Sequence, residues 1–244
     1  MSCLLLRLAA PLQSWGTSSR FTRRNTDRAP SRSGVLGLLA AATGRRRTDP
    51  LEELLDLRIG VRIEQPGRLE RDFQTARSRD GQISMPLSYR FYLADAVFAV
   101  AVHGPDQLLE TVEQALRAPA FPLYLGRRSC PPAGVLLHGM HDGDLAQVLA
   151  EAPWLASPWV QKQHRAPMVT LDTVADCPAT EPRAELVRDE PVSFDPRHRQ
   201  YDWRTVLSSQ VTVPNPLHRS PTPIPAAAFA GGGHDPMAVF EEPI

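Results

Sequence analysis

Apolar segments in the first 142 residues alternate between the two-residue period of a strand and the longer period of a helix. Strands are predicted at 3–8, 57–64, 94–103 and 135–138, and helices at 34–43 and 105–117. An Asp80-Gly81 pair within the polar stretch 68–90 indicates a projecting hairpin. The order strand, helix, strand, hairpin, strand, helix, strand is that of a ferredoxin-like or RRM-like domain. We therefore expect an α+β fold whose first domain spans residues 1–142.

The rest of the chain has a different character. Residues 143–213 combine a short helix at 145–150 with proline-broken strands at 168–174, 184–187 and 203–213. This pattern predicts a small, mostly β C-terminal region. Residues 214–244 hold 7 of the chain's 24 prolines and three consecutive glycines, which predicts a Pro/Gly-rich tail without a packed core.

Arginine is concentrated at the start of the chain. Residues 1–47 contain nine arginines and one acidic residue, Asp27, so this segment carries +8 although the formal net charge of the whole chain is zero. A guanidinium group can donate two parallel hydrogen bonds to a phosphate and can also stack on a base. The asymmetry predicts a local anionic partner and a separate surface that faces solvent or protein.

The loop at 11–30 and the start of the next helix form the first candidate binding site. Its arginines are Arg20, Arg23, Arg24, Arg28 and Arg32. A helix N-terminus near Ser33 offers unpaired N–H groups to a phosphate, and clustered arginines add affinity for any nucleic-acid backbone. Trp15 and Phe21 could stack on unpaired bases. The alternative is a solvated basic loop with Trp15 in the core.

Two further segments could contact nucleic acid. In Gly126-Arg127-Arg128-Ser129 a glycine lets the backbone approach a phosphate, although a plain surface turn fits equally well. The hairpin at 68–90 carries Arg77, Arg79 and Arg90 and could insert between nucleotides. A decorated surface loop is the alternative for this hairpin.

No enzyme motif is present in the sequence. The seven histidines show no HExxH or other metal-ligand spacing, and no Walker, GxSxG or GxGxxG pattern occurs. Cys3, Cys130 and Cys177 are too far apart for a zinc site or a disulfide framework. We therefore expect no catalytic residue, no metal and no cofactor. The alternative is a metal-independent ribonuclease in which His103 or His138 acts as general base on a ribose 2′-OH.

Composition limits where the chain resides. Hydrophobic residues make up 42% of the sequence, enough for a core. The N-terminal apolar stretch is short and is interrupted by Arg7, and no apolar run approaches the roughly 20 residues of a membrane span. We expect a cytoplasmic protein without membrane contact.

Several sequence blocks together resemble the CasD family, a subunit of the type I-E Cascade complex and part of the RAMP superfamily. The blocks are 8–16 (LAAPLQSWG), 19–21 (SRF), 30–35 (PSRSGV), 37–42 (GLLAAA), 92–96 (YLADA) and 124–132 (YLGRRSCPP). From about residue 145 onward the likeness is looser. The resemblance implies an RRM-like domain with a protruding β-hairpin thumb, which we place at 66–92.

The resemblance also implies a function. Members of the family bind the 5′ handle of the CRISPR RNA (crRNA), cap the CasC backbone filament and contact the large subunit CasA. CasB and CasE would belong to the same complex, the target DNA would lie nearby through the guide, and RNA cleavage would belong to CasE. Some relatives in another subtype cleave RNA, which keeps the nuclease alternative open.

Candidate RNA contacts follow from matching these blocks to the sequence. They are Gln13, Trp15, Arg20, Arg23, Arg24, Arg32, Ser33, Arg127, Arg128 and Ser129, with Arg77, Arg79 and Arg90 in the thumb.

Overall fold

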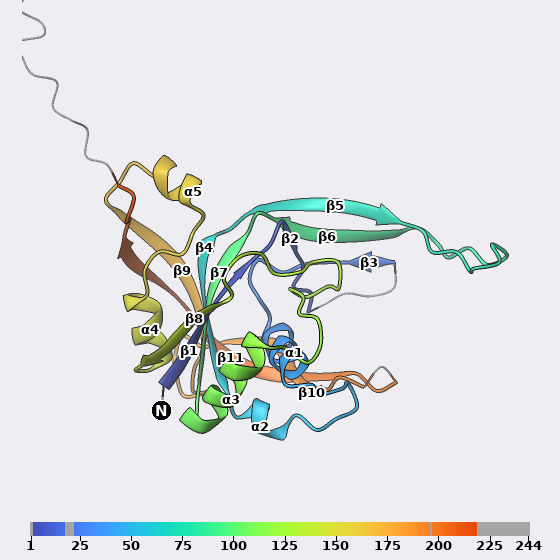
Figure 1. The fold of residues 1–244 in the computed structure, drawn as a ribbon, viewed down its shortest axis with the longest axis horizontal. Coiled ribbons are helices and arrows are strands. Elements are labelled where there is room, and N and C mark those ends of the chain that lie inside the picture. The colour runs from blue at the N-terminus through green and yellow to red at the C-terminus, as the bar shows by residue number, and fades with distance from the viewer. Residues whose placement is uncertain (1, 18–21, 196, 219–244) are drawn as a thin grey trace, which may run out of the picture.

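β1 (Ser2–Ala9) and β7 (Val97–Gly104) are almost entirely apolar and pair with each other in a seven-stranded sheet (Figure 1). The computed structural model describes residues 2–17, 22–195 and 197–218. The strand order is β10-β11-β9-β4-β7-β1-β8, and each neighbouring pair is antiparallel. The other strands are β4 (Arg58–Gln65), β8 (Leu137–Asp142), β9 (Met168–Asp176), β10 (Glu185–Ser193) and β11 (Gln200–Pro214).

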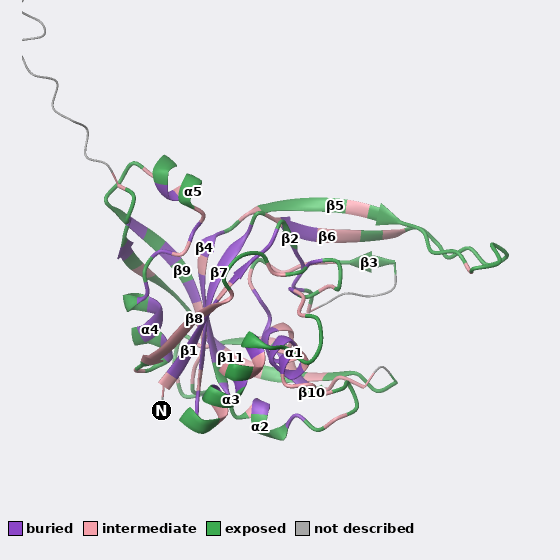
Figure 2. Cartoon of the chain, viewed as in Figure 1, coloured by how far each residue is buried: buried purple, intermediate pink, exposed green. Residues whose placement is uncertain are grey.

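Alternate residues of β1 face two different layers, because successive side chains of a strand point to opposite faces. Leu4, Leu6 and Leu8 belong to the larger core, which includes α1 (Arg32–Ala42), α2 (Glu52–Leu55) and α3 (Asp106–Arg117). Cys3 and Leu5 pack on the other side with α4 (Leu145–Glu151). Residues of the central strands are the most buried, and α5 (Pro158–Gln163) lies at the periphery (Figure 2). The predicted mixture of helices and strands is confirmed.

The predicted helix after the basic loop is present but begins earlier. It starts at Arg32, and Ser31 caps it by accepting a hydrogen bond from the Gly34 amide at 3.3 Å. A capping hydroxyl satisfies one of the free amides of the first turn. Gly44, with φ +80°, follows the end of the helix. None of the helices in the described part of the chain is long and apolar enough to cross a membrane.

The C-terminal strands are not a separate appendage. The sequence predicted a distinct small region at 143–213, but β9 pairs with β4 and continues the central sheet through β11 and β10. Proline and polar residues made these strands look independent, whereas β9 pairs with β4, more than 100 residues earlier in the chain. Of the predicted tail at 214–244, residues 219–244 lie outside the described part.

A second, smaller sheet carries the predicted hairpin. β5 (Arg68–Gln74) and β6 (Ser88–Ala94) pair antiparallel and project from the body (Figure 1). Beyond them Gly81, with φ +74°, donates its amide to the Ser78 carbonyl, as the Asp-Gly pair predicted. β2 (Leu12–Gln13) and β3 (Arg23–Arg24) flank β6, in the order β2-β6-β3.

A fully buried ion pair between Arg62 and Glu64 of β4 stabilises the packing of the segment after α4 on the sheet. The Arg62 Nε lies 2.5 Å from Glu64 Oε1, and its other nitrogens donate to the carbonyls of Leu149, Ala152 and Pro153. Burial raises the pKa of Glu64, and the Arg62 charge opposes that rise. A buried charge that loses its partner is strongly destabilising.

We expect Arg62→Met to lower the free energy of unfolding by about 3–5 kcal/mol, because Glu64 would remain buried without its cation. Urea denaturation of the full chain measures this loss. Arg58→Met, an exposed position on the same strand, is the control and should cost less than about 1 kcal/mol. Equal losses in the two variants would contradict the role assigned to the ion pair.

Candidate nucleic-acid interface

Arginines from three separate segments meet beside the hairpin. Strand β3 pairs in parallel with β6, which places Arg23 beside Tyr89 and Arg24 beside Arg90. From the loop after α3, the Arg127 guanidinium donates to the Arg24 carbonyl at 2.9 Å. The structure therefore brings together residues that are up to 104 positions apart in the sequence. Arg20 and Phe21, also predicted contacts, lie outside the described residues.

This arginine cluster, defined as Arg23, Arg24, Arg90, Arg127 and Arg128, keeps donors for a ligand. Arg23, Arg24 and Arg128 are exposed. The Nε of Arg90 and the Nη1 of Arg127 are buried and have no hydrogen-bond partner in the described structure. An unsatisfied buried donor costs about 1–3 kcal/mol, so a neighbouring anion that accepts from it is stabilised. The cluster therefore has the chemistry of a phosphate site.

The loop that carries Arg127 is held in place by close packing and backbone hydrogen bonds. Gly126 has φ +83°, and a Cβ there would lie 1.7 Å from the Ser14 carbonyl oxygen, so only glycine fits. The Leu125 amide donates to the Cys130 carbonyl at 2.7 Å, which closes the loop on itself. Ser14 in turn donates its amide to the Leu125 carbonyl at 3.2 Å. Of the predicted contacts in this loop, Arg128 and Ser129 are exposed.

Gln13 and Trp15 lie inside the protein, which contradicts direct contact with RNA. Trp15 is 1% exposed, and its indole nitrogen donates to the Gln13 side-chain oxygen at 3.1 Å. The ring lies against Gly34, where a Cβ would approach it to 2.8 Å. Stacking of Trp15 on a base is therefore excluded by its packing, and the alternative of Trp15 in the core is confirmed.

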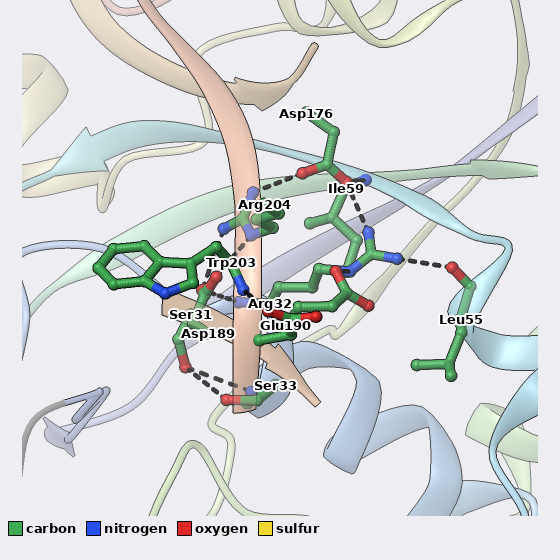
Figure 3. A network of polar contacts seen from close by, with 12 residues as sticks. Ser31, Arg32, Ser33, Leu55, Ile59, Asp176, Asp189, Glu190, Trp203 and Arg204 are labelled. Carbon is green, nitrogen blue, oxygen red and sulfur yellow. Dashed lines mark hydrogen bonds and ion pairs between the residues drawn. The ribbon is translucent and has the colours of Figure 1, made fainter. Parts of the chain in front are cut away.

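Arg32 is also an interior residue, held by a network of charges (Figure 3). It is 6% exposed; its Nη1 lies 2.6 Å from Asp176, its Nε lies 2.5 Å from Glu190, and its Nη2 donates to the Leu55 carbonyl. Each guanidinium nitrogen thus faces a carboxylate or a carbonyl inside the protein, which corrects the prediction of Arg32 as an RNA contact.

The start of α1 is likewise occupied by the protein itself. The Arg32 amide donates to Asp189 at 2.7 Å, so a carboxylate takes the place predicted for a phosphate. Arg204 bridges Asp189 and Asp176 and completes the network. Ser33 is half-buried, with its hydroxyl 3.4 Å from that of Ser31. No sequence signal could reveal this, because the carboxylates lie more than 140 residues away.

The hairpin residues divide by position. Arg77 and Arg79 are exposed beyond the ends of β5 and β6, where Arg77 forms an isolated bridge with Ser84. Arg90 lies at the root, in the arginine cluster. The sequence analysis did not single out Arg71 or Tyr92 as site residues. The Tyr92 ring lies 4.5 Å from the Arg127 guanidinium carbon. The alternation of aromatic and charged residues in 68–94 was the available signal.

His103, one of the two histidines of the nuclease alternative, lies away from this cluster. His103 pairs with Cys3, whereas the end of β7 that leads to β6 pairs with Ala9. Cys3 and Ala9 are six residues apart, about 20 Å along a strand. Burial, and then the charges of Arg7 and His141, lower the pKa of His138. Among the described residues no group of His, Cys, Asp or Glu is arranged to hold a metal.

We expect Arg32→Met to destabilise the fold by about 3–5 kcal/mol, because Glu190 would lose its ion-pair partner and Asp176 and Asp189 would have to share Arg204. The unfolding midpoint in urea reports this loss. Arg28→Met, at an exposed position, should stay within about 0.5 kcal/mol of the unsubstituted protein. A similar small effect at both positions would show that Arg32 is not structural.

Comparison with known proteins places this geometry in a family. A model of the CRISPR-associated Cas5 proteins matches residues 3–207. The CRISPR system Cascade subunit CasD of Escherichia coli strain K12 is 34% identical over 151 residues, covering 53% of this chain and 67% of that protein. A chain of a solved CRISPR RNA-guided surveillance complex is 36% identical with a TM-score of 0.74, covering 91% of this chain and 95% of its own. A crystal structure of a Cas protein is 34% identical with a TM-score of 0.67, covering 89% and 98%. The chain belongs to the Cas5 family of CRISPR-associated proteins.

Proposed function

We propose that this protein is a non-catalytic subunit of a CRISPR RNA-guided surveillance complex that binds the 5′ handle of the crRNA. The observation that carries the proposal is the arginine cluster, which draws on β3, β6 and the 126–129 loop. Its exposed guanidinium groups suit phosphates, and it lies beside a hairpin that also carries exposed arginines. The likeness to CasD of Cascade supports the choice of crRNA as the ligand.

The fold supports the same proposal. Strands β4, β7, β1 and β8, with α1 and α3, follow the order of an RRM-like domain, and we infer that β5 and β6 form its thumb. In this arrangement the thumb extends from the edge at which the arginine cluster lies. A guide strand held by the cluster would therefore continue along the hairpin.

Partner contacts follow from membership in such a complex. We propose that the chain caps the CasC filament and docks CasA, in the cytoplasm, with CasB and CasE in the same assembly. Exposed apolar residues away from the arginine cluster, such as Trp159 and Trp203, offer surfaces for these subunits.

The runner-up, an endoribonuclease, has weaker support. It needs a histidine within hydrogen-bond reach of an RNA 2′-OH held by the arginine cluster. His103 lies toward the opposite end of β7, and the His138 Nε2 is buried.

We expect Arg23→Ala with Arg24→Ala to weaken binding of handle RNA and to flatten its salt dependence. Two lost phosphate contacts should reduce the slope of log K against log salt by roughly 1.4 for a single strand. Filter binding at several salt concentrations measures both quantities. Arg117→Ala with Arg183→Ala removes two exposed arginines elsewhere and should leave the slope unchanged. If both pairs gave the same slope as the unsubstituted protein, the arginine cluster would not be the RNA site.

We also expect the retained RNA to remain intact. End-labelled repeat RNA incubated with the full chain, with and without EDTA, should run at full length on a denaturing gel. Shortened RNA that disappears on His103→Ala or His138→Ala would replace the proposal with the nuclease alternative.

A further inference from the structure

Arginines in this protein are held in two different ways, which leave different parts of the guanidinium group free. Arg32 and Arg62 meet carboxylates and carbonyls, which occupy their N–H donors. Arg127 is held by a ring instead, because its guanidinium carbon lies 4.5 Å from the centre of the Tyr92 ring. A ring contacts the flat face of a guanidinium group, whereas the N–H groups point outward in the plane. The contact with Tyr92 therefore does not use the donors of Arg127.

Tyr92 is a well-fixed support for this guanidinium group. It is 4% exposed and packs in the larger core, at the end of β6 that lies nearest the body. Arg90 precedes it by two residues on the same strand and pairs with Arg24, so the three side chains share one face of the small sheet. The ring therefore places Arg127 on the same face as two other arginines of the cluster.

The other contacts of Arg127 leave its charge and part of its donor set available. Its Nη2 donates to the Arg24 carbonyl at 2.9 Å, and its Nη1 is buried without a partner in the described structure. Glu70, which lies opposite Tyr92 on β5, is exposed and forms no ion pair with Arg127 among the described residues. A buried donor without an acceptor costs free energy, and an anion beside it would offset that cost.

We propose that Tyr92 is a positioning residue for RNA binding, which holds the flat face of the Arg127 guanidinium group so that its free N–H groups bind a phosphate of the RNA. The inference rests on the proposed function, because the ligand is the backbone of the same RNA. Tyr92 acts only through Arg127, since it is too buried to contact the RNA itself. A carboxylate in its place would also hold Arg127, but it would neutralise the charge and occupy the donors, as in the network around Arg32.

The test measures binding of handle RNA to the full chain by filter binding at several salt concentrations. Tyr92→Leu removes the ring and should weaken binding roughly three- to tenfold, the equivalent of one cation–π contact. It should also reduce the slope of log K against log salt toward that of Arg127→Ala, although it removes no charge. Tyr92→Phe keeps the ring and should bind like the unsubstituted protein. Leu54→Ala, which removes buried volume in α2, is the control for lowered stability and should leave the slope unchanged.

A double-mutant cycle separates positioning from a general structural role. If Tyr92 acts through Arg127, Tyr92→Leu should have no further effect on RNA affinity in Arg127→Ala protein. Equal weakening in both backgrounds overturns the inference and leaves the handle-binding proposal intact, and so does normal binding by Tyr92→Leu when Arg127→Ala binds weakly. Tyr92→Met replaces Tyr92→Leu in the cycle if the leucine variant does not fold. If neither Arg127→Ala nor the pair Arg23→Ala with Arg24→Ala changes RNA binding, the proposed function and the inference both fail.

Discussion

The side-chain amide of Gln13 joins the two sheets at the point where the chain leaves β1. Its nitrogen donates to the carbonyls of Leu8 and Ala96, and its oxygen accepts from Trp15. Because Gln13 is fully buried, each of these bonds replaces water that cannot enter, and a lost partner would leave a polar atom unsatisfied. The amide therefore fixes where β2 begins to pair with β6, and the hairpin, the 126–129 loop and the arginine cluster are all built on that pairing.

Arginine has two separate functions in this chain, and burial decides between them. Arg32 and Arg62 are enclosed and paired with carboxylates and carbonyls, so they hold β9, β10 and the segment after α4 to the body. Arg23 and Arg24 are exposed and keep their donors. The same fork-shaped group suits both settings, because it can satisfy several acceptors in one plane. Counting arginines in a sequence therefore overestimates the surface that is available to a ligand.

Local patterns predicted the elements well, and the arrangement of distant segments poorly. The helix predicted at 34–43, which spans 32–42 in the structure, was visible from its apolar period, and the hairpin was visible from Asp80-Gly81, because these signals act within a few residues. The positions of Trp15 and Arg32 were not, since their partners are set by tertiary packing. The same limit explains why β9, β10 and β11 looked independent although they extend the central sheet. In the candidate site, the arginines of β3 and the 126–129 loop were identified, but their contact through the Arg24 carbonyl depends on the fold.

A chain with zero net charge can still present a strongly positive site, because a surface charge acts only over a short distance in salt solution. Screening in physiological salt confines the influence of a surface charge to about 8 Å. Asp176, Asp189 and Glu190 neutralise Arg32 and Arg204 within the network around the start of α1, where the three carboxylates exceed the two guanidinium groups by one charge. The acidic residues of β5 alternate onto one face of the hairpin and leave the other without carboxylates. The net charge of zero is thus a sum over separate local balances, and the period of two along a β-strand determines which face of the hairpin carries its carboxylates.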